Sequence, residues 1–186
     1  MSGGGIAAAG GKKGRIRSVL VCYASRYGST REIAGWIADE LQGAGVITDC
    51  LPAGKEIRPG AYDAAVIGSA LYMGKWLAEA RELVSRERVP LGRMPVAVFS
   101  VGYSLKERTR ASLQAGEAAL SDIRLYISPL DAAFFPGKVD LERMGPADRA
   151  ILSLAGIPGG DFCDADLVRA WARTLPSLLG LIQGGE

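Results

Sequence analysis

The stretch Val19-Leu-Val-Cys-Tyr-Ala-Ser-Arg-Tyr-Gly-Ser-Thr30 decides the fold. Its first five residues form an apolar run, which predicts a buried strand. A turn of small and hydroxyl-bearing residues follows, and then apolar residues recur at helical spacing from Ile33 to Leu41. The turn therefore lies at the carboxyl end of a strand and the amino end of a helix. Free backbone N–H groups and the helix dipole favour an anion there, most often a phosphate.

Two known phosphate motifs are absent from this turn. It lacks the Gly-Lys-Ser/Thr ending of a P-loop, and it lacks the G-x-G-x-x-G fingerprint of dinucleotide-binding proteins. Ser29-x-x-Glu32 also fits a capping box, in which these residues only start a helix. A capping box needs neither Ser25 nor the density of hydroxyls around it, so the sequence leaves both interpretations open.

The rest of the chain alternates predicted strands and helices. Strands are predicted at 46–52, 64–68, 95–99 and 132–139. Helices are predicted at 76–84, 107–122 and 141–155, with a final helix capped by Asp161 or Asp164 and packed through Leu167, Ala170, Trp171, Leu175 and Leu178. This alternation predicts a doubly wound α/β domain of three layers. Its five parallel strands take the order 2-1-3-4-5, which opens a crevice between strands one and three.

Three loops meet at the carboxyl edge of such a sheet. They follow the first, third and fourth predicted strands, at 25–30, 69–75 and 100–106. The first loop is the anion cradle, in which Arg26 either offsets phosphate charge or is a solvated surface arginine. Tyr72 and Tyr103 supply aromatic rings to the other two loops, where they either cover a ligand ring or pack on the protein. Trp76 is expected to pack the following helix.

The chain resembles the flavodoxin-like family. Tyr-x-Ser-x-x-Gly-Ser-Thr resembles the FMN phosphate loop, and Gly68-Ser-Ala-Leu-Tyr-Met-Gly74, Phe99-Ser-Val-Gly102 and Phe135-Pro-Gly-Lys-Val-Asp140 extend the similarity over about residues 16–180. The resemblance implies FMN as cofactor. It implies that the first loop holds the phosphate, the second touches the ring, and the third lines the pyrimidine edge with backbone N–H groups. The expected FMN-binding residues are Ser25, Arg26, Tyr27, Gly28, Ser29, Thr30, Ser69, Ala70, Leu71, Tyr72, Met73, Gly74, Ser100, Val101, Gly102 and Tyr103.

Within the family, the chain is most similar to the branch of quinone-dependent protoporphyrinogen oxidases of haem biosynthesis. A minimal flavodoxin ends in one helix, whereas this chain inserts residues 138–160 before its last helix. That branch has a comparable insertion, associated with substrate or membrane contact. The insertion here has fewer basic residues, and a plain helix covering the sheet edge explains it equally well. The resemblance implies a redox partner or quinone as acceptor and a porphyrinogen as candidate substrate.

Two other functions stay open at this point. A flavodoxin-type electron carrier has no small-molecule substrate of its own, and such carriers are strongly acidic, whereas this chain has a net charge of +2. A regulatory domain that has lost its cofactor is the third alternative. A response-regulator receiver is excluded, because Ala24 and Ser25 stand where its acidic cluster would be.

Length and composition limit the remaining classes. The chain has 186 residues with 48% hydrophobic residues, which fits one globular domain at 16–182 after a flexible tail at 1–15. No apolar run approaches the ~20 residues of a membrane helix, so we expect a cytoplasmic protein with at most peripheral membrane contact. Nothing in the sequence indicates nucleic-acid binding, and a homodimer stays open.

Side-chain chemistry is sparse. The chain has no histidine and three dispersed cysteines, which argues against a zinc site or a histidine-based triad. Cys22 and Cys50 are expected to be core thiols, and Cys163 is the one expected near the surface. No side chain is predicted to act as general acid, base, nucleophile or metal ligand, as suits chemistry carried by a cofactor.

Overall fold

The main sheet of the molecule has the predicted parallel order. The structure is a computed structural model that describes residues 17–182, and the predicted tail at 1–15 lies outside the described residues. Five parallel strands run in the order β2-β1-β3-β5-β6. Their bounds are β1 Ser18–Ala24, β2 Ile47–Pro52, β3 Ala64–Tyr72, β5 Val96–Gly102 and β6 Asp131–Pro136. The short β4, Lys75–Trp76, pairs antiparallel with the end of β3, so the order 2-1-3-4-5 is confirmed with one strand added.

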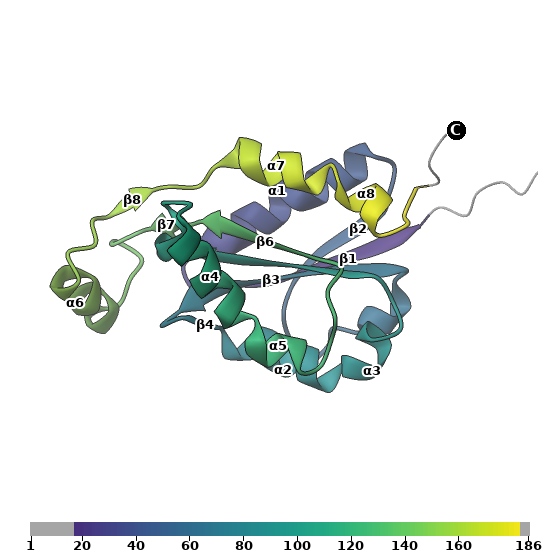
Figure 1. Ribbon diagram of the computed structural model, residues 1–186, viewed down its shortest axis with the longest axis horizontal. Helices are drawn as coiled ribbons and strands as arrows, with labels where there is room; N and C mark the ends of the chain where they lie inside the picture. The colour runs from purple at the N-terminus through teal and green to yellow at the C-terminus, as the bar shows by residue number, and fades with distance from the viewer. Residues whose placement is uncertain (1–16, 183–186) are drawn as a thin grey trace, which may run out of the picture.

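Helices cover both faces of the sheet (Figure 1). One face carries α1 (Ser29–Gly43), α7 (Ala165–Ala172) and α8 (Leu175–Leu178). The other face carries α2 (Ala78–Arg86), α3 (Arg88–Leu91), α4 (Arg110–Ala119) and α5 (Ser121–Arg124). Short 3-10 turns lie at Pro59–Ala61 and Tyr103–Leu105. The predicted three-layer arrangement is confirmed.

The central strands β1, β3 and β5 are largely apolar because both of their faces are buried. Val19 and Val21 of β1 face the α1 side, whereas Ala65 and Ile67 of β3 face the α2 side. Phe99 is fully buried and lies 6.3 Å from the ring of Trp171, centroid to centroid. Gly68 is required beside it, because a Cβ at this position would lie 2.0 Å from the Phe99 ring.

Three predicted helices differ from the observed ones in where they begin or in being divided. The predicted helix at 76–84 begins only at Ala78, and Trp76 lies in β4 instead. The predicted helix at 107–122 is divided into α4 and α5, which meet at Leu120. The predicted helix at 141–155 is only α6, Pro146–Leu154, because a proline is accommodated in the first turn of a helix and not in its interior.

The final helix also differs from the prediction. Asp164 caps it as expected, by accepting a hydrogen bond from the backbone N–H of Leu167 at 2.9 Å. The helix then breaks into α7 and α8, with Pro176 in the first turn of α8. The break shifts the buried face, so Leu178 is 39% exposed, whereas the buried positions are Val168, Ala172, Leu175 and Leu179.

The end of the predicted last strand and the insertion form a separate projection. β6 ends at Pro136, and the chain continues into β7 (Lys138–Val139), α6 and β8 (Gly160–Asp161). β7 and β8 pair antiparallel and close the base of the insertion. α6 contains no buried residue and stands beyond the carboxyl ends of the parallel strands, at the left of Figure 1. Within 17–182, helices fall short of the length and hydropathy that a membrane span requires.

Candidate functional site

The start of α1 has the geometry of an anion site. Gly28 is the N-cap residue and takes a left-handed conformation with φ 104°, which favours glycine. Its backbone N–H donates to Ser25 Oγ at 3.1 Å. Ser29 is already the first helical residue and no side chain caps the helix, so the alternative of a capping box is wrong. The first-turn N–H groups have no side-chain cap, and an anion can accept from them.

Thr30 gives an independent indication at the same place. The residue is fully buried, and its Oγ1 has no hydrogen-bond partner. Buried polar atoms in proteins nearly always have partners, since an unpaired one is costly. A phosphate oxygen at the helix start would accept from this hydroxyl, so the residues present fit a phosphate group.

The second loop is a tight turn between β3 and β4. Met73 and Gly74 both have positive φ, at 51° and 75°. Beneath the turn, Ser69 Oγ accepts from the backbone N–H of Leu77 at 2.9 Å and donates to the carbonyl of Ala70 at 2.9 Å. Ser100 Oγ likewise accepts from Trp76 Nε1 at 2.8 Å. The hydroxyls of the predicted site residues Ser69 and Ser100 are therefore hydrogen-bonded to other groups of the protein.

The third loop is packed against the segment that follows the insertion. The ring of Tyr103 lies edge-on to that of Phe162, with 5.4 Å between centroids. The Lys106 ammonium lies 4.7 Å from the centroid of the Phe162 ring. Gly102 lies close to the second loop, because a Cβ there would be 3.1 Å from Leu71 Cβ. The second and third loops are therefore in direct contact.

The three loops surround one cavity of about 280 Å³. Most of the predicted residues line it: Arg26, Tyr27, Ser29, Ala70, Leu71, Tyr72, Met73, Val101, Gly102 and Tyr103. Ser25 lines an adjoining groove with Arg26 and Tyr72. Gly28 and Thr30 lie at the start of α1, Ser69 and Ser100 are buried beneath the loops, and Gly74 lies in the turn. The structure brings the predicted residues to one end of the sheet.

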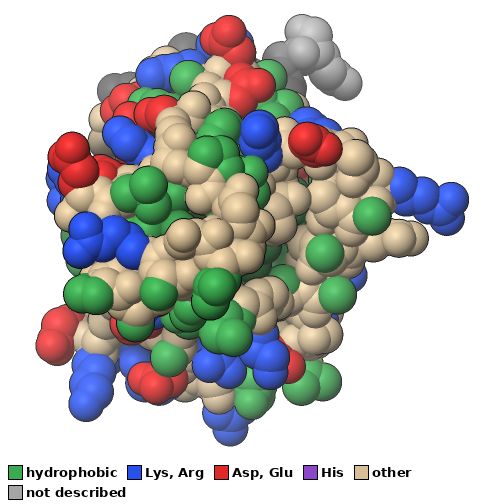
Figure 2. Space-filling model, turned by 90° about the vertical axis from the view of Figure 1, so that its left-hand side faces the viewer, with side chains coloured by type: hydrophobic (Ala, Val, Ile, Leu, Met, Phe, Trp, Pro, Cys, Tyr) green, Lys and Arg blue, Asp and Glu red, His purple; other side chains and the backbone are tan. Residues whose placement is uncertain are grey.

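Sequence reasoning missed a fourth wall of this cavity. The insertion and the residue before it supply Gly137, Lys138, Val139, Met144, Asp148, Ile151 and Leu152. The extra length after the last strand was the signal that an additional element lies near the rim. Its sequence did not reveal that α6 turns back over the loops. In the space-filling view of this end of the molecule, hydrophobic side chains are exposed among lysine and arginine side chains (Figure 2).

One carboxylate joins the insertion to two of the loops. Asp148 Oδ2 accepts from Arg26 Nη2 at 2.8 Å and from Arg26 Nε at 3.1 Å, and it also accepts from the Tyr27 hydroxyl. Asp148 Oδ1 accepts from the Tyr72 hydroxyl at 2.9 Å. The Arg26 guanidinium lies 4.1 Å from the centroid of the Tyr72 ring. Arg26 is therefore paired within the protein.

The same contacts shift the acidity of the groups. The hydrogen bond from Tyr27, with those from Tyr72 and Arg26, lowers the pKa of Asp148 below its ordinary value. The hydrogen bond to Asp148 raises the pKa of Tyr72. Asp148 is thus held as a carboxylate and Tyr72 as a neutral donor.

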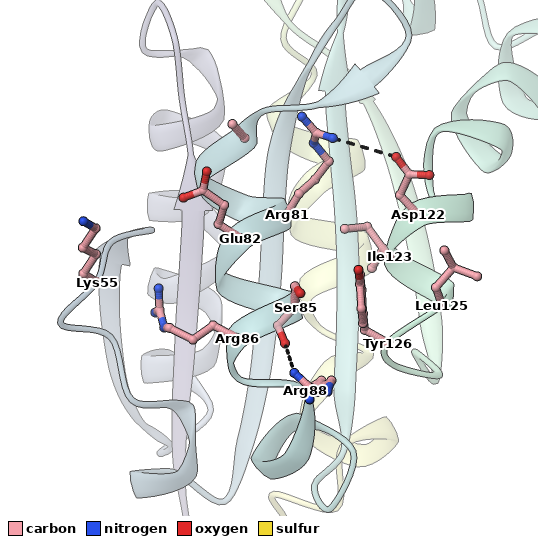
Figure 3. Close-up of a pocket in the computed structure, with 11 residues that line it drawn as sticks. Lys55, Arg81, Glu82, Ser85, Arg86, Arg88, Asp122, Ile123, Leu125 and Tyr126 are labelled. Atoms are coloured by element: carbon pink, nitrogen blue, oxygen red, sulfur yellow. Dashed lines mark hydrogen bonds and ion pairs between the residues drawn. The ribbon is translucent and has the colours of Figure 1, made fainter.

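A larger cleft of about 740 Å³ lies elsewhere, between α2 and α5. Figure 3 shows its side chains, with Arg81 directed at Asp122 and Arg88 at Ser85. Arg81 Nη1 lies 4.0 Å from Asp122 Oδ2, and Arg88 Nη1 donates to the Ser85 carbonyl at 3.0 Å. None of the three rim loops contributes to it, so we assign the candidate site to the smaller cavity.

Nucleophilic and metal chemistry find little support in the described residues. Burial raises the pKa of the Cys22 thiol to about 12. Burial is also the main reason that the pKa of the half-buried Cys163 thiol is raised to about 12. Within 17–182, no three His, Cys, Asp or Glu side chains gather as metal ligands would. What the cavity offers is an anion cradle, apolar walls and tyrosine rings.

Comparisons with known proteins agree with this geometry. A sequence model of the family described as "Flavodoxin domain" matches residues 20–156. Protoporphyrinogen IX dehydrogenase [quinone] of Escherichia coli (strain K12) is 29% identical over 102 residues, which cover 54% of this chain and 56% of the relative. The chain therefore matches little more than half the length of this curated relative.

Solved structures share the fold at low identity. A flavodoxin from the domain Archaea superposes with a TM-score of 0.55 at 12% identity, covering 88% of this chain and 99% of that one. Oxidised flavodoxin 2 from Bacillus cereus gives a TM-score of 0.55 at 17% identity, covering 86% and 98%. At these identities the likeness concerns the fold alone.

Proposed function

The chain belongs to the flavodoxin domain family, and from that premise we propose that it binds FMN in the 280 Å³ cavity and acts as an oxidoreductase. One observation carries the proposal. The uncapped start of α1, with the unpartnered Thr30 Oγ1, lies at the same end of the sheet as the loops that follow β3 and β5. Membership of this family indicates a flavin as the cofactor. FMN combines a phosphate with a flat aromatic ring, and each part has a matching feature here.

The phosphate would be held at the start of α1. The first-turn N–H groups and the hydroxyls of Ser25, Ser29 and Thr30 are the donors, and the unpartnered Thr30 Oγ1 gains an acceptor. Arg143, which is paired with Asp140 at 3.4 Å, also lies nearby, since its Nη1 is 3.3 Å from where a Gly28 Cβ would stand. A side chain at position 28 would also strain the left-handed backbone.

The ring would lie between the second and third loops. Tyr72 offers an aromatic face, and Leu71 and Val101 offer apolar walls. The positive-φ turn at Met73 and Gly74 lets backbone groups approach a flat ligand closely. The pyrimidine edge would face the backbone of Gly102 and Tyr103.

Bound FMN supplies the redox chemistry, by accepting electrons from one partner and passing them to another. The residues of this chain bind and orient it. Met144, Ile151 and Leu152 of the insertion add apolar side chains to the lining of the cavity. The Tyr72 hydroxyl donates to the paired Asp148 carboxylate, which links the second loop to the insertion.

For the substrate, we propose a porphyrinogen, with a quinone as acceptor. The support is the sequence match to protoporphyrinogen IX dehydrogenase together with an insertion at the cavity. Oxidation of one porphyrinogen to a porphyrin would release six electrons and six protons, which would reduce three quinone molecules to quinols. We propose a cytoplasmic location with peripheral membrane contact, where a membrane quinone would be reached.

Two measurements test this function in turn. The purified protein is first titrated with FMN and its visible spectrum recorded. A protein that stays colourless and does not bind FMN at micromolar concentration contradicts the cofactor assignment. The loaded protein is then supplied with protoporphyrinogen IX and a menaquinone analogue, and porphyrin fluorescence is followed under anaerobic conditions.

A second candidate function is electron transfer without a substrate of its own. It predicts FMN binding and no quinone-dependent porphyrin formation above the uncatalysed rate. The net charge of +2 disfavours it, since acidic carriers rely on a negative field to find basic partners.

A further inference from the structure

The mouth of the cavity contains a complete receptor for a carboxylate. Arg26 presents Nε and Nη2 to Asp148 Oδ2 at 3.1 and 2.8 Å. The hydroxyls of Tyr27 and Tyr72 donate to the same carboxylate. A guanidinium edge with two added hydroxyl donors is the donor set that recognises carboxylates in proteins. We call Arg26, Tyr27 and Tyr72 the carboxylate receptor.

The receptor is held in place without Asp148. The Arg26 guanidinium stacks on the Tyr72 ring at 4.1 Å and lies 5.6 Å from the Tyr27 ring centroid. Arg26 Nε also donates to the Tyr27 hydroxyl at 3.1 Å. All three residues belong to the rim loops of the main sheet, whereas Asp148 belongs to the insertion. The donors therefore keep their arrangement when the carboxylate leaves.

Asp148 is carried by an element that is weakly packed. α6 has no buried residue, and its Leu154 is 91% exposed. The insertion is tied at its base by the two pairs of β7 and β8, and glycines flank α6 at 145 and 156. Little apolar contact is lost when α6 moves away, so an external carboxylate can replace Asp148 at low cost.

We propose that the carboxylate receptor binds the carboxylate of an organic acid substrate, and that Asp148 occupies the receptor as an internal competitor until that substrate arrives. This inference rests on the proposed function, since it places the ligand beside the flavin. The walls next to the receptor are apolar, with Met144, Ile151 and Leu152 lining the same cavity. The ligand class is accordingly a carboxylic acid with an apolar, flat body.

The test measures binding of a simple probe, 2-naphthoate, by calorimetry to the wild-type protein and to Asp148→Ala, each loaded with FMN and each free of it. 2-Naphthamide is the uncharged control of the same shape. Removing the competitor should tighten naphthoate binding at least tenfold and leave naphthamide binding unchanged. The gain should disappear in the double variant Asp148→Ala with Arg26→Gln, and Asp148→Asn should give an intermediate gain.

Ile151→Ala is the matched control for loosening of α6. Ile151 lines the cavity and is 49% exposed, and it takes no part in the receptor. If this variant gained as much naphthoate affinity as Asp148→Ala, opening of the helix and not release of the receptor would explain the result. Unchanged naphthoate affinity in Asp148→Ala, or equal gains for naphthamide, would overturn the proposal.

The arms with and without FMN separate this inference from the proposed function. Failure to bind FMN, with naphthoate still gaining affinity in Asp148→Ala, refutes the function and leaves the receptor standing. FMN binding without any naphthoate gain refutes the receptor alone. Displacement of bound FMN by naphthoate would assign Arg26 to the cofactor phosphate and also overturn the proposal.

Discussion

The rim loops and the insertion line the same cavity but are built in different ways. The loops after β3 and β5 rest on fully buried polar groups, such as Ser69 and the Trp76–Ser100 hydrogen bond of 2.8 Å. α6 of the insertion has no buried residue and is joined to the loops through Asp148. One wall is part of the core, and the other is attached to it by polar contacts.

This difference separates stability from ligand choice. Substitutions beneath the rim loops should change the free energy of unfolding, because they remove buried contacts. Substitutions in the insertion should change what the cavity binds while the fold persists. The following predictions test that division, beginning with the largest expected effect.

Phe99→Ala should destabilise the protein by about 3–5 kcal/mol, because it leaves a cavity among buried rings. Phe99 lies 6.3 Å from both the Phe135 and the Trp171 rings, centroid to centroid. The free energy of unfolding in urea is the measurement. Leu154→Ala in the insertion is the matched control, and it should cost less than about 0.5 kcal/mol. Comparable losses in the two variants would remove the distinction between the two regions.

Trp76→Phe should cost about 1–3 kcal/mol, because Ser100 Oγ loses the donor at 2.8 Å in a buried place. A double-mutant cycle with Ser100→Ala isolates the pair from the change in volume. Thermal and urea unfolding supply the free energies. A coupling energy near zero would show that the floor of the loops does not depend on this hydrogen bond.

Thr30→Val should separate cofactor binding from stability. Its Oγ1 is buried and unpartnered, so the FMN-free protein should gain about 1 kcal/mol of stability when the hydroxyl is removed. The affinity for FMN should fall by about tenfold, because a phosphate donor is lost. A destabilised protein with unchanged FMN affinity would mean that the hydroxyl has a structural partner.

The attachment of α6 should weaken in acid. The folded pKa of Asp148 is lowered, chiefly by the Tyr27 hydrogen bond, so its contribution is present above the unfolded pKa of about 3.9. The contribution is lost as the pH falls through the folded pKa. The stability difference between the wild type and Asp148→Asn should be small at about pH 7 and should shrink steadily as the pH falls below the unfolded pKa of about 3.9. A difference that persisted in acid would exclude the carboxylate as its source.

The same division explains how far the sequence could be interpreted. The apolar runs from Val19 to Phe135 predict the strands, because a parallel sheet buried on both faces requires them. The alternation of these strands with helices then predicts their order. Local chemistry also located the start of α1, although it left a capping box open at Ser29. The structure excludes the capping box, because the N-cap residue is Gly28 in a left-handed conformation. The sequence alone does not specify that conformation.

Longer-range features were not predictable in this way. Trp76 has the spacing of a helix face, but its indole bonds to Ser100 and the chain stays extended in β4. Asp148 is 122 residues from Arg26, and no local pattern couples them. The predicted buried face of the last helix was wrong beyond the break before Pro176, because the helix is divided there into α7 and α8. The placements of the individual FMN-binding residues stay predictions.

The most direct test of the account compares the affinities of the protein for FMN and for riboflavin, which lacks the phosphate, by quenching of flavin fluorescence. If the start of α1 holds the phosphate, FMN should bind about a hundredfold more tightly, a difference of about 3 kcal/mol. Ser29→Asp should abolish most of this advantage while leaving riboflavin binding nearly unchanged, since a carboxylate in the cradle repels only the phosphate. Equal affinities for the two flavins, or an advantage that survives Ser29→Asp, would contradict the account.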